Sequence, residues 1–163
     1  DIMERHFTSN VFIVDDDKVL LIYHKKLSTW LPPGGHIDAN ETPVDSARRE
    51  VFEETGLEIE IMMQENAWVQ SDEARSFQRP YLCLIEDIPE YRDTPAHQHI
   101  DMVYLAKNIR TGIEKPNYDE VREMRWFSRD DIEALTVGEN LLFNVKMVLD
   151  HIFDHVIPVT CPL

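Results

Sequence analysis

Residues 35–57 read GHIDANETPVDSARREVFEETGL, and this stretch is the most informative part of the chain. Thr42 followed by Pro43 has the pattern of a helix N-cap and a first helical residue, and Asp45 places an acid near the positive end of that helix. Gly56 is a typical stop at the C-terminal end. The sequence therefore predicts a helix of about 13 residues between Thr42 and Gly56.

The two faces of this predicted helix differ in chemistry. At 100° per residue, apolar side chains gather on one face: Val44, Ala47, Val51 and Phe52. Glu50, Glu53 and Glu54 gather on the other, where like charges at i, i+3 and i+4 cost about 0.2–0.5 kcal/mol per pair. A hard divalent cation such as Mg²⁺ or Mn²⁺ prefers carboxylate oxygens and would relieve this repulsion. The acidic face therefore indicates a metal site.

Seven residues of this stretch stand at intervals that carry a resemblance. They are Gly35, Glu41, Arg49, Glu50, Glu53, Glu54 and Gly56, with apolar Val51 and Leu57 between and after them. In this order and spacing the stretch resembles the signature of the Nudix hydrolases, and every fixed position is filled. Glu-x-x-Glu-Glu alone is more often a solvated helix face, and the full set of intervals reverses that preference.

The resemblance implies a fold and a reaction. The fold would be α+β, with a mixed β-sheet sandwiched between helices. In the family, three glutamates at these positions hold divalent cations, which assigns Glu50, Glu53 and Glu54 to Mg²⁺ or Mn²⁺ here, with Gly34 of the preceding turn as a further metal-site candidate. Arg49 would orient the carboxylates, including that of Glu41. The reaction would be hydrolysis of the diphosphate linkage in a nucleoside diphosphate joined to another group.

The general base stays open at this stage. Bound metal ions bridge phosphate oxygens and lower the pKa of a bound water, so that hydroxide can attack phosphorus. Family members take the base from the helix or from a later loop. Glu53 is the first choice, and Glu120 or Glu123, shortly before Trp126, are the loop candidates.

Residues outside the helix are candidates for substrate contacts. Lys25, Arg75 and Arg79 could contact phosphates, and Trp30 could stack on a base, although aromatic residues in strands are more often core.

His97 and His99 raise the question of a second metal site. They point to one face of a strand, with no third ligand nearby in the sequence, so we expect solvated edge histidines.

Sequence marks of several family subgroups are missing. Residues 72–74 read Asp-Glu-Ala where ADP-ribose hydrolases carry a proline, and the marks of dinucleoside polyphosphate and NADH hydrolases are also missing. A nucleoside triphosphate or a modified nucleotide remains as the expected substrate. The alternatives are a sensor domain that binds a nucleotide or sugar phosphate without cleaving it, and removal of diphosphate from the 5′ end of RNA.

Short apolar runs predict the remaining elements. Residues 11–14 and 19–23 predict a hairpin, residues 79–85, 101–106 and 124–127 predict strands, and residues 140–156 predict a final helix. Strands and helices interleave without regular βαβ repetition, which also favours an α+β class.

Length and composition set further expectations. The 163 residues fit a single domain, and a formal charge of −15 disfavours binding to duplex nucleic acid. Cys83 and Cys161 lack CxxC spacing, which favours free thiols in a reducing compartment. No apolar run approaches a membrane span of roughly 20 residues, and no secretion signal is recognisable. We expect a cytoplasmic monomer or homodimer that does not bind membranes.

Overall fold

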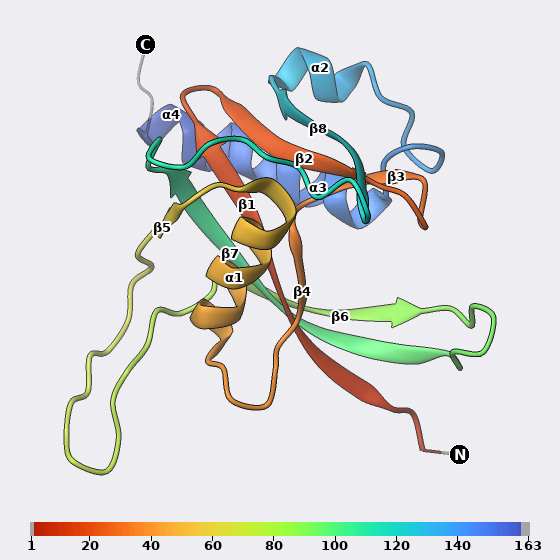
Figure 1. The fold of residues 1–163 in the computed structure, drawn as a ribbon. Coiled ribbons are helices and arrows are strands. Elements are labelled where there is room, and N and C mark those ends of the chain that lie inside the picture. Colours follow the sequence, from red (N-terminus) through yellow and green to blue (C-terminus); the bar gives the residue numbers. More distant parts are fainter. Residues whose placement is uncertain (1, 161–163) are drawn as a thin grey trace.

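A twisted, mixed eight-stranded sheet runs through the computed structural model, which describes residues 2–160 (Figure 1). Its strands are β1 (Arg5–Asp15), β2 (Lys18–His24), β3 (Thr29–Leu31), β4 (Gly34–His36), β5 (Ile59–Ile61), β6 (Leu82–Ile88), β7 (His97–Asn108) and β8 (Val121–Phe127). The main path is β3-β2-β1-β7-β5, while β4 pairs with β1, β6 with β7 and β8 with β2. β1 and β7 run parallel over most of their length, and the other pairs are antiparallel.

Helices cover both faces of the central strands. They are α1 (Pro43–Thr55), α2 (Arg129–Glu133), α3 (Phe143–His151), a π-helical turn η1 (Ile152–Val156) and α4 (Ile157–Thr160). Figure 1 places α1 on the near side of β1 and β7, and α3 behind them. The predicted α+β sandwich is confirmed by this layering.

The alternation of side chains along β1 builds the two halves of the core. Val11 and Ile13 point to one face, where they pack with Val44, Ala47 and Val51 of α1. The intervening residues Phe12 and Val14 point to the other face and pack with buried residues of α3, including Val145, Val148 and Leu149. Because strand side chains alternate with a period of two, one apolar strand supports a helix on each side.

Several predicted elements are confirmed, with shifted ends. The hairpin forms with Asp15 opposite Lys18. The strand predicted at residues 79–85 is found at Leu82–Ile88, and the final helix begins at Phe143 and widens into the π-helical turn after His151. Phe52, predicted on the core face of α1, is 58% exposed; it follows Val51 directly and is turned about 100° away from that buried residue.

The structure bears on two further expectations, which concern the cysteines and the possibility of a membrane-spanning helix. Cys83 is a free, exposed thiol, whereas Cys161 lies outside the described residues. Within residues 2–160, no helix has the length and apolar character that crossing a bilayer would require.

Candidate active site

Helix α1 has both predicted caps. The Thr42 hydroxyl accepts a hydrogen bond from the backbone N–H of Asp45 at 3.2 Å, and the Asp45 carboxylate accepts one from the Thr42 N–H at 3.2 Å. Gly56 adopts the left-handed conformation with φ of 75°, and its N–H donates to the carbonyl of Phe52 at 2.9 Å. These caps fix the start and the end of the helix, and therefore the positions of the glutamates between them.

Strand β4 passes close to the acidic face of α1. A Cβ atom on Gly35 would lie 2.6 Å from Oε1 of Glu50, so only glycine allows this approach without displacing the carboxylate. The backbone N–H of Gly34 donates to Oε1 of Glu54 at 2.8 Å. The glycine pair thus contacts two of the three predicted metal ligands.

Arg49 lies at the centre of an ion-pair network. Its Nε and Nη2 atoms donate to the two oxygens of Glu41 at 2.7 and 2.8 Å, a bidentate pair. Its Nη1 atom donates to Glu50 at 2.9 Å and to Glu53 at 3.2 Å. Nη2 also donates to the carbonyl oxygen of His36 in β4, at 3.2 Å. Arg49 therefore ties the acidic face to the strand beneath it.

Burial separates the three glutamates. Glu54 is 3% exposed, whereas the side chain of Glu53 is 55% exposed. Burial raises the pKa of Glu54 to about 8, against the lowering effect of the Gly34 N–H, and the charges of Glu50 and Glu120 add to the rise. Burial also raises the pKa of Glu50. A buried carboxylate among like charges costs free energy that a bound cation would offset.

The donor set fits a hard divalent cation. Its atoms are carboxylate oxygens, the preferred ligands of Mg²⁺ and Mn²⁺. Within residues 2–160, the one set of three candidate ligand atoms within 4.8 Å of one another belongs to histidines, so the glutamates stand further apart. Arg49 holds Glu50 and Glu53, and the exposed side chain of Glu53 has room to turn toward an ion.

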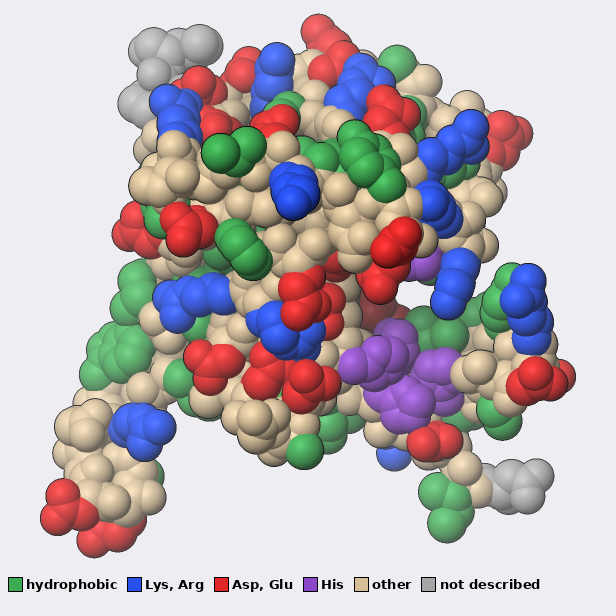
Figure 2. All heavy atoms as spheres, in the orientation of Figure 1, with side chains coloured by type: hydrophobic (Ala, Val, Ile, Leu, Met, Phe, Trp, Pro, Cys, Tyr) green, Lys and Arg blue, Asp and Glu red, His purple; other side chains and the backbone are tan. Residues whose placement is uncertain are grey.

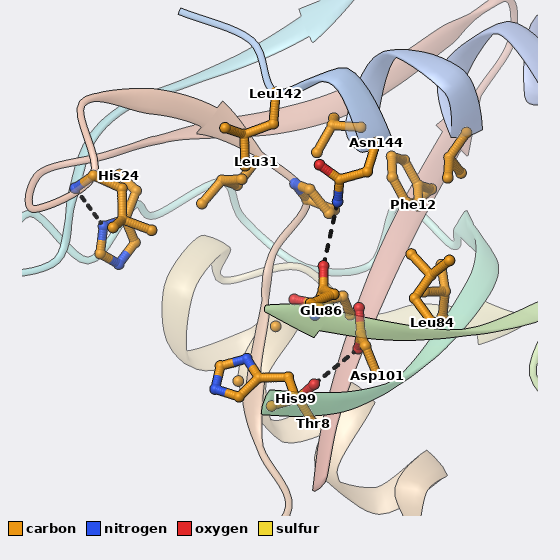
Figure 3. Close-up of a pocket in the computed structure, with 18 of the residues that line it drawn as sticks. Thr8, Phe12, His24, Leu31, Leu84, Glu86, His99, Asp101, Leu142 and Asn144 are labelled. Carbon is orange, nitrogen blue, oxygen red and sulfur yellow. Dashed lines mark hydrogen bonds between the residues drawn. The ribbon is translucent and has the colours of Figure 1, made fainter. Parts of the chain in front are cut away.

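A pocket of about 250 Å³ adjoins Glu54 (Figure 3). Apolar side chains from three elements form part of its wall, among them Phe12, Leu84 and Val148. Its other lining residues include polar side chains, among them Thr8, Glu86, His99, Asp101 and Asn144. Asn144 donates to Glu86 at 3.3 Å, and Thr8 donates to Asp101 at 3.0 Å. The pocket therefore combines apolar surface with hydrogen-bonding groups beside the acidic helix.

Of the two loop candidates for the general base, Glu120 lies near the acidic face of α1 and Glu123 lies outside the pocket. Glu120 precedes β8, and its charge reaches both Glu50 and Glu54. Its carbonyl accepts from the N–H of Lys25, which brings that lysine to the same side. Glu123 lies exposed on β8 opposite Tyr23 and does not line the pocket.

The other predicted substrate contacts lie elsewhere. Arg75 and Arg79 are exposed on the segment between β5 and β6 and do not line the pocket, so their role stays a prediction. Trp30 is 6% exposed and packs edge-on against Tyr23 and Phe127. Its ring is enclosed by the core and presents no open face for a base.

A family model described as the NUDIX domain matches residues 4–145. The chain belongs to the Nudix family. A crystal structure of a Nudix-family hydrolase from Clostridium perfringens is 30% identical, with a TM-score of 0.72, and the match covers 93% of this chain and 98% of that one.

Two named relatives share shorter stretches with this Nudix chain. An RNA pyrophosphohydrolase of Bartonella henselae is 44% identical over 63 residues, which is 38% of this chain and 32% of the relative. A probable DHNTP pyrophosphohydrolase of Lactococcus lactis is 30% identical over 102 residues, which is 61% of this chain and 52% of the relative. The chain thus spans about a third and about half of the lengths of these relatives.

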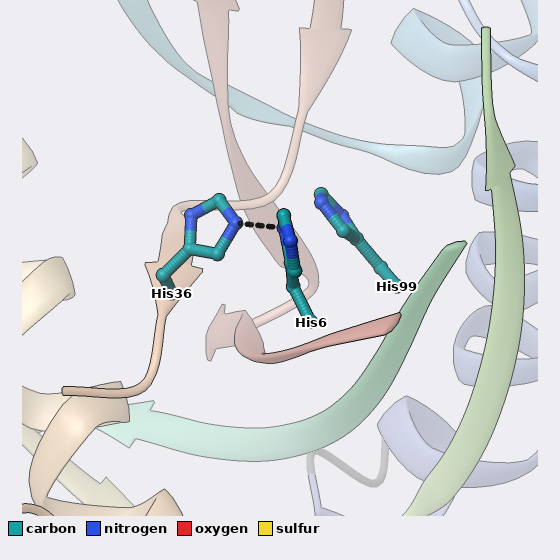
Figure 4. Close-up of side chains that lie close together, drawn as sticks. All are labelled: His6, His36 and His99. Carbon is teal, nitrogen blue, oxygen red and sulfur yellow. Dashed lines mark hydrogen bonds between the residues drawn. The ribbon is translucent and has the colours of Figure 1, made fainter. Parts of the chain in front are cut away.

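The expectation that His97 and His99 are solvated edge histidines is wrong. His97 is 8% exposed, and His6 and His36 lie beside His99 (Figure 4). The space-filling view shows this histidine group next to the acidic side chains over α1 (Figure 2). Sequence reasoning missed His6 and His36 because pairing of β1 with β4 and β7 brings them there.

The sequence interpretation also missed the pocket carboxylates Glu86 and Asp101 in this Nudix fold. They lie on neighbouring strands, and burial raises the pKa of both, that of Glu86 to about 7. A signal was present in β7, where Asp101 interrupts an apolar run, whereas Glu86 of β6 is followed directly by a second acid, Asp87.

Proposed function

We propose that this Nudix chain is a metal-dependent pyrophosphohydrolase. It would cleave the diphosphate linkage of a nucleoside diphosphate joined to another moiety, with a nucleoside triphosphate or a modified nucleotide as substrate. One observation carries the proposal: Glu54 belongs both to the acidic face of α1 and to the wall of the pocket. A nucleoside in the pocket would therefore extend its phosphates toward the three glutamates.

The carboxylates of α1 would supply the metal site. Glu50, Glu53 and Glu54 would hold Mg²⁺ or Mn²⁺, which offsets phosphate charge and lowers the pKa of a bound water. Arg49 would act as a positioning residue, because it fixes Glu50 and Glu53 through Nη1 and is itself held by both oxygens of Glu41. The N–H of Gly34 would keep one oxygen of Glu54 turned toward β4.

Proton removal from the attacking water is assigned to Glu53. Its carboxylate is the most exposed of the three, and it would reach a water near a phosphate by turning away from Nη1 of Arg49. Glu120 remains the loop alternative, because its charge lies close enough to raise the pKa of Glu50 and Glu54.

The pocket would hold the base and sugar. Its volume of about 250 Å³ lies just below the range of about 300–1,000 Å³ typical for drug-sized ligands, which suits part of a nucleotide rather than all of it. Apolar walls favour a flat ring, while Glu86, Asp101 and Asn144 offer hydrogen bonds. Burial and the neighbouring carboxyl of Asp101 raise the pKa of Glu86, so this pair can present a donor and an acceptor together.

A second candidate is hydrolysis at the 5′ end of RNA. The match to an RNA pyrophosphohydrolase favours it, because that stretch is the more identical of the two relatives described above. The net charge of −15 opposes binding of a long phosphate backbone. A nucleotide substrate is therefore the first candidate.

The test is product release from a panel with Mg²⁺ or Mn²⁺. The panel holds nucleoside triphosphates, oxidised nucleotides, nucleotide sugars, dinucleoside polyphosphates and a 5′-triphosphate oligonucleotide. Native chain is compared with Glu53→Gln and with Glu60→Gln, a matched change at an exposed glutamate of β5. Turnover in the native chain and in Glu60→Gln, but not in Glu53→Gln, is expected. Tight nucleotide binding without turnover would overturn catalysis and favour a sensor.

A further inference from the structure

We propose that His6, His36 and His99 form a binding site for a transition-metal ion of the zinc class, separate from the carboxylates of α1. One ligand nitrogen from each histidine lies within 4.8 Å of the others. Nε2 of His36 and Nδ1 of His6 are 3.4 Å apart. Two nitrogens bound tetrahedrally at a Zn–N distance of 2.0–2.1 Å are also about 3.4 Å apart. The distance between Nε2 of His36 and Nδ1 of His6 is therefore already the one expected when both nitrogens bind one zinc ion.

The sheet places these imidazoles together. His6 of β1 is the register partner of His99 of β7, in a parallel pair. His36 of β4 is the register partner of Thr8, two residues along β1 from His6. Residues separated by two positions on a strand share a face, so His6, His36 and His99 project from three adjacent strands toward one point.

Hydrogen bonds around the cluster resemble those that orient metal-binding histidines. The carboxylate of Glu4 accepts from Nε2 of His6 at 2.9 Å, so the other ring nitrogen of His6, Nδ1, is the one that faces Nε2 of His36. Metal-binding histidines commonly donate their second N–H to a carboxylate in this way. His97 bonds through Nδ1 to the carbonyl of Pro95 at 2.9 Å, and its Nε2 lies 3.2 Å from Nε2 of His99. His97 therefore contacts His99 and holds its ring in place, while the set of three ligand nitrogens does not include it.

The chemistry of the cluster selects the class of metal. Imidazole nitrogen suits Zn²⁺, Ni²⁺, Co²⁺ and Cu²⁺, whereas Mg²⁺ prefers oxygen. His36 and His99 also line the pocket beside Glu54. The proposed ion would thus lie next to the pocket without sharing a ligand with the acidic face.

Cobalt absorption and zinc titration test the site on the full chain without a histidine tag, in excess Mg²⁺. The native chain is expected to give visible Co²⁺ bands and a zinc-dependent rise in Tm. His6→Ala and His99→Ala should lose the bands and weaken zinc binding at least about 10-fold. His155→Ala, at an exposed histidine outside the cluster, should match the native chain.

Two further variants separate this site from the proposed hydrolase. Glu53→Gln should keep zinc binding unchanged, whatever its effect on turnover. Glu4→Gln should weaken zinc binding by about 10-fold, because it removes the carboxylate partner of His6. Circular dichroism and Tm without metal establish that each variant is folded. Absent Co²⁺ bands in the native chain, or bands that persist in both histidine variants, would overturn the proposal.

Discussion

The acidic face of α1 and the histidine cluster are two groups of candidate metal ligands side by side, and they are built differently. Glu50, Glu53 and Glu54 come from consecutive turns of one helix, whereas His6, His36 and His99 come from three strands far apart in the chain. Helical spacing alone predicts the first group. The second depends on strand order and register, which the sequence does not state. A local pattern therefore shows one group before the structure is known, and only the sheet shows the other.

The two groups also differ in electrostatic cost. The glutamates carry like charges, one of them buried, so the acidic face is destabilised without a cation and Arg49 offsets only part of the repulsion. Imidazole binds a metal in its neutral form, so the histidine cluster has no comparable repulsion to relieve. We therefore expect that removing a carboxylate from the acidic face lowers turnover without lowering stability. Substitutions in the histidine cluster are expected to weaken binding of zinc-class ions.

Glu54→Gln should have the largest effect. The amide keeps the shape and can still accept from Gly34, but it removes a buried charge from the proposed metal site. Turnover with Mg²⁺ should fall on the order of 10²–10³-fold, the size typical for loss of one charge-stabilising group. Without metal, Tm measured above pH 8, where the Glu54 carboxylate is ionised, should rise because repulsion with Glu50 and Glu120 is removed. Native turnover together with an unchanged Tm would contradict the claim that the acidic face carries an electrostatic cost that a metal ion relieves.

Gly35→Ala should reduce turnover by about 100-fold, the cost of misplacing a reacting group by about 1 Å. The added Cβ would lie 2.6 Å from Oε1 of Glu50 and must displace that carboxylate. Steady-state kinetics and a crystal structure of the variant check both steps. Full activity with Glu50 displaced would mean that the position of this carboxylate does not matter.

Arg49→Lys should lower kcat by about 10-fold with little change in KM. Lysine keeps the charge but cannot form the bidentate pair with Glu41 while holding Glu50 and Glu53. Arg49→Ala should lower kcat further, so lysine would rescue part of the loss. A variant that raises KM alone would indicate that Arg49 contacts substrate instead.

Asp15→Asn should have the smallest effect and provides an ordinary charge pair for reference. Hydrogen bonds from Arg110 lower the pKa of Asp15, so the pair stabilises the fold above the unfolded pKa of about 3.9 and loses this contribution as pH falls through the lower folded value. Because Arg110 is 63% exposed and solvent screens the pair, the loss at pH 7 should be small. Urea unfolding at pH 7 and pH 2.5 checks this. An equal loss at both pH values would exclude the charge as its cause.

The sequence predicted the parts of the fold that depend on near neighbours. Thr42, Asp45 and Gly56 determine the ends of α1, and the spacing of Val44, Ala47 and Val51 predicts its buried face. Phe52 was misassigned because its 100° step from Val51 carries it out of the core. The strand at residues 82–88 begins three residues later than the apolar run of residues 79–85 predicts, and one of its two acids, Glu86, lines the pocket.

The candidate site also contains some contacts that local spacing predicts and others that depend on packing between distant segments. The contacts of Arg49 with Glu41, Glu50 and Glu53 were predicted, because all but Glu41 lie on one helix and the signature supplies Glu41. The burial of Glu54 and its bond to Gly34 follow from the packing of β4 against α1 and could not be predicted from helical spacing. Whether a side chain faces solvent or a pocket depends on tertiary contacts between distant segments.

The most direct test of metal-dependent catalysis at the acidic face of α1 is the rate of nucleotide hydrolysis as a function of Mg²⁺ concentration. It is measured for the native chain, Glu53→Gln and Glu60→Gln. We expect no turnover in EDTA, a rise to a plateau in the native chain and in Glu60→Gln, and a plateau at least about 100-fold lower in Glu53→Gln. Turnover that persists in EDTA, or a native plateau in Glu53→Gln, would contradict the assignment of catalysis to the acidic face of α1.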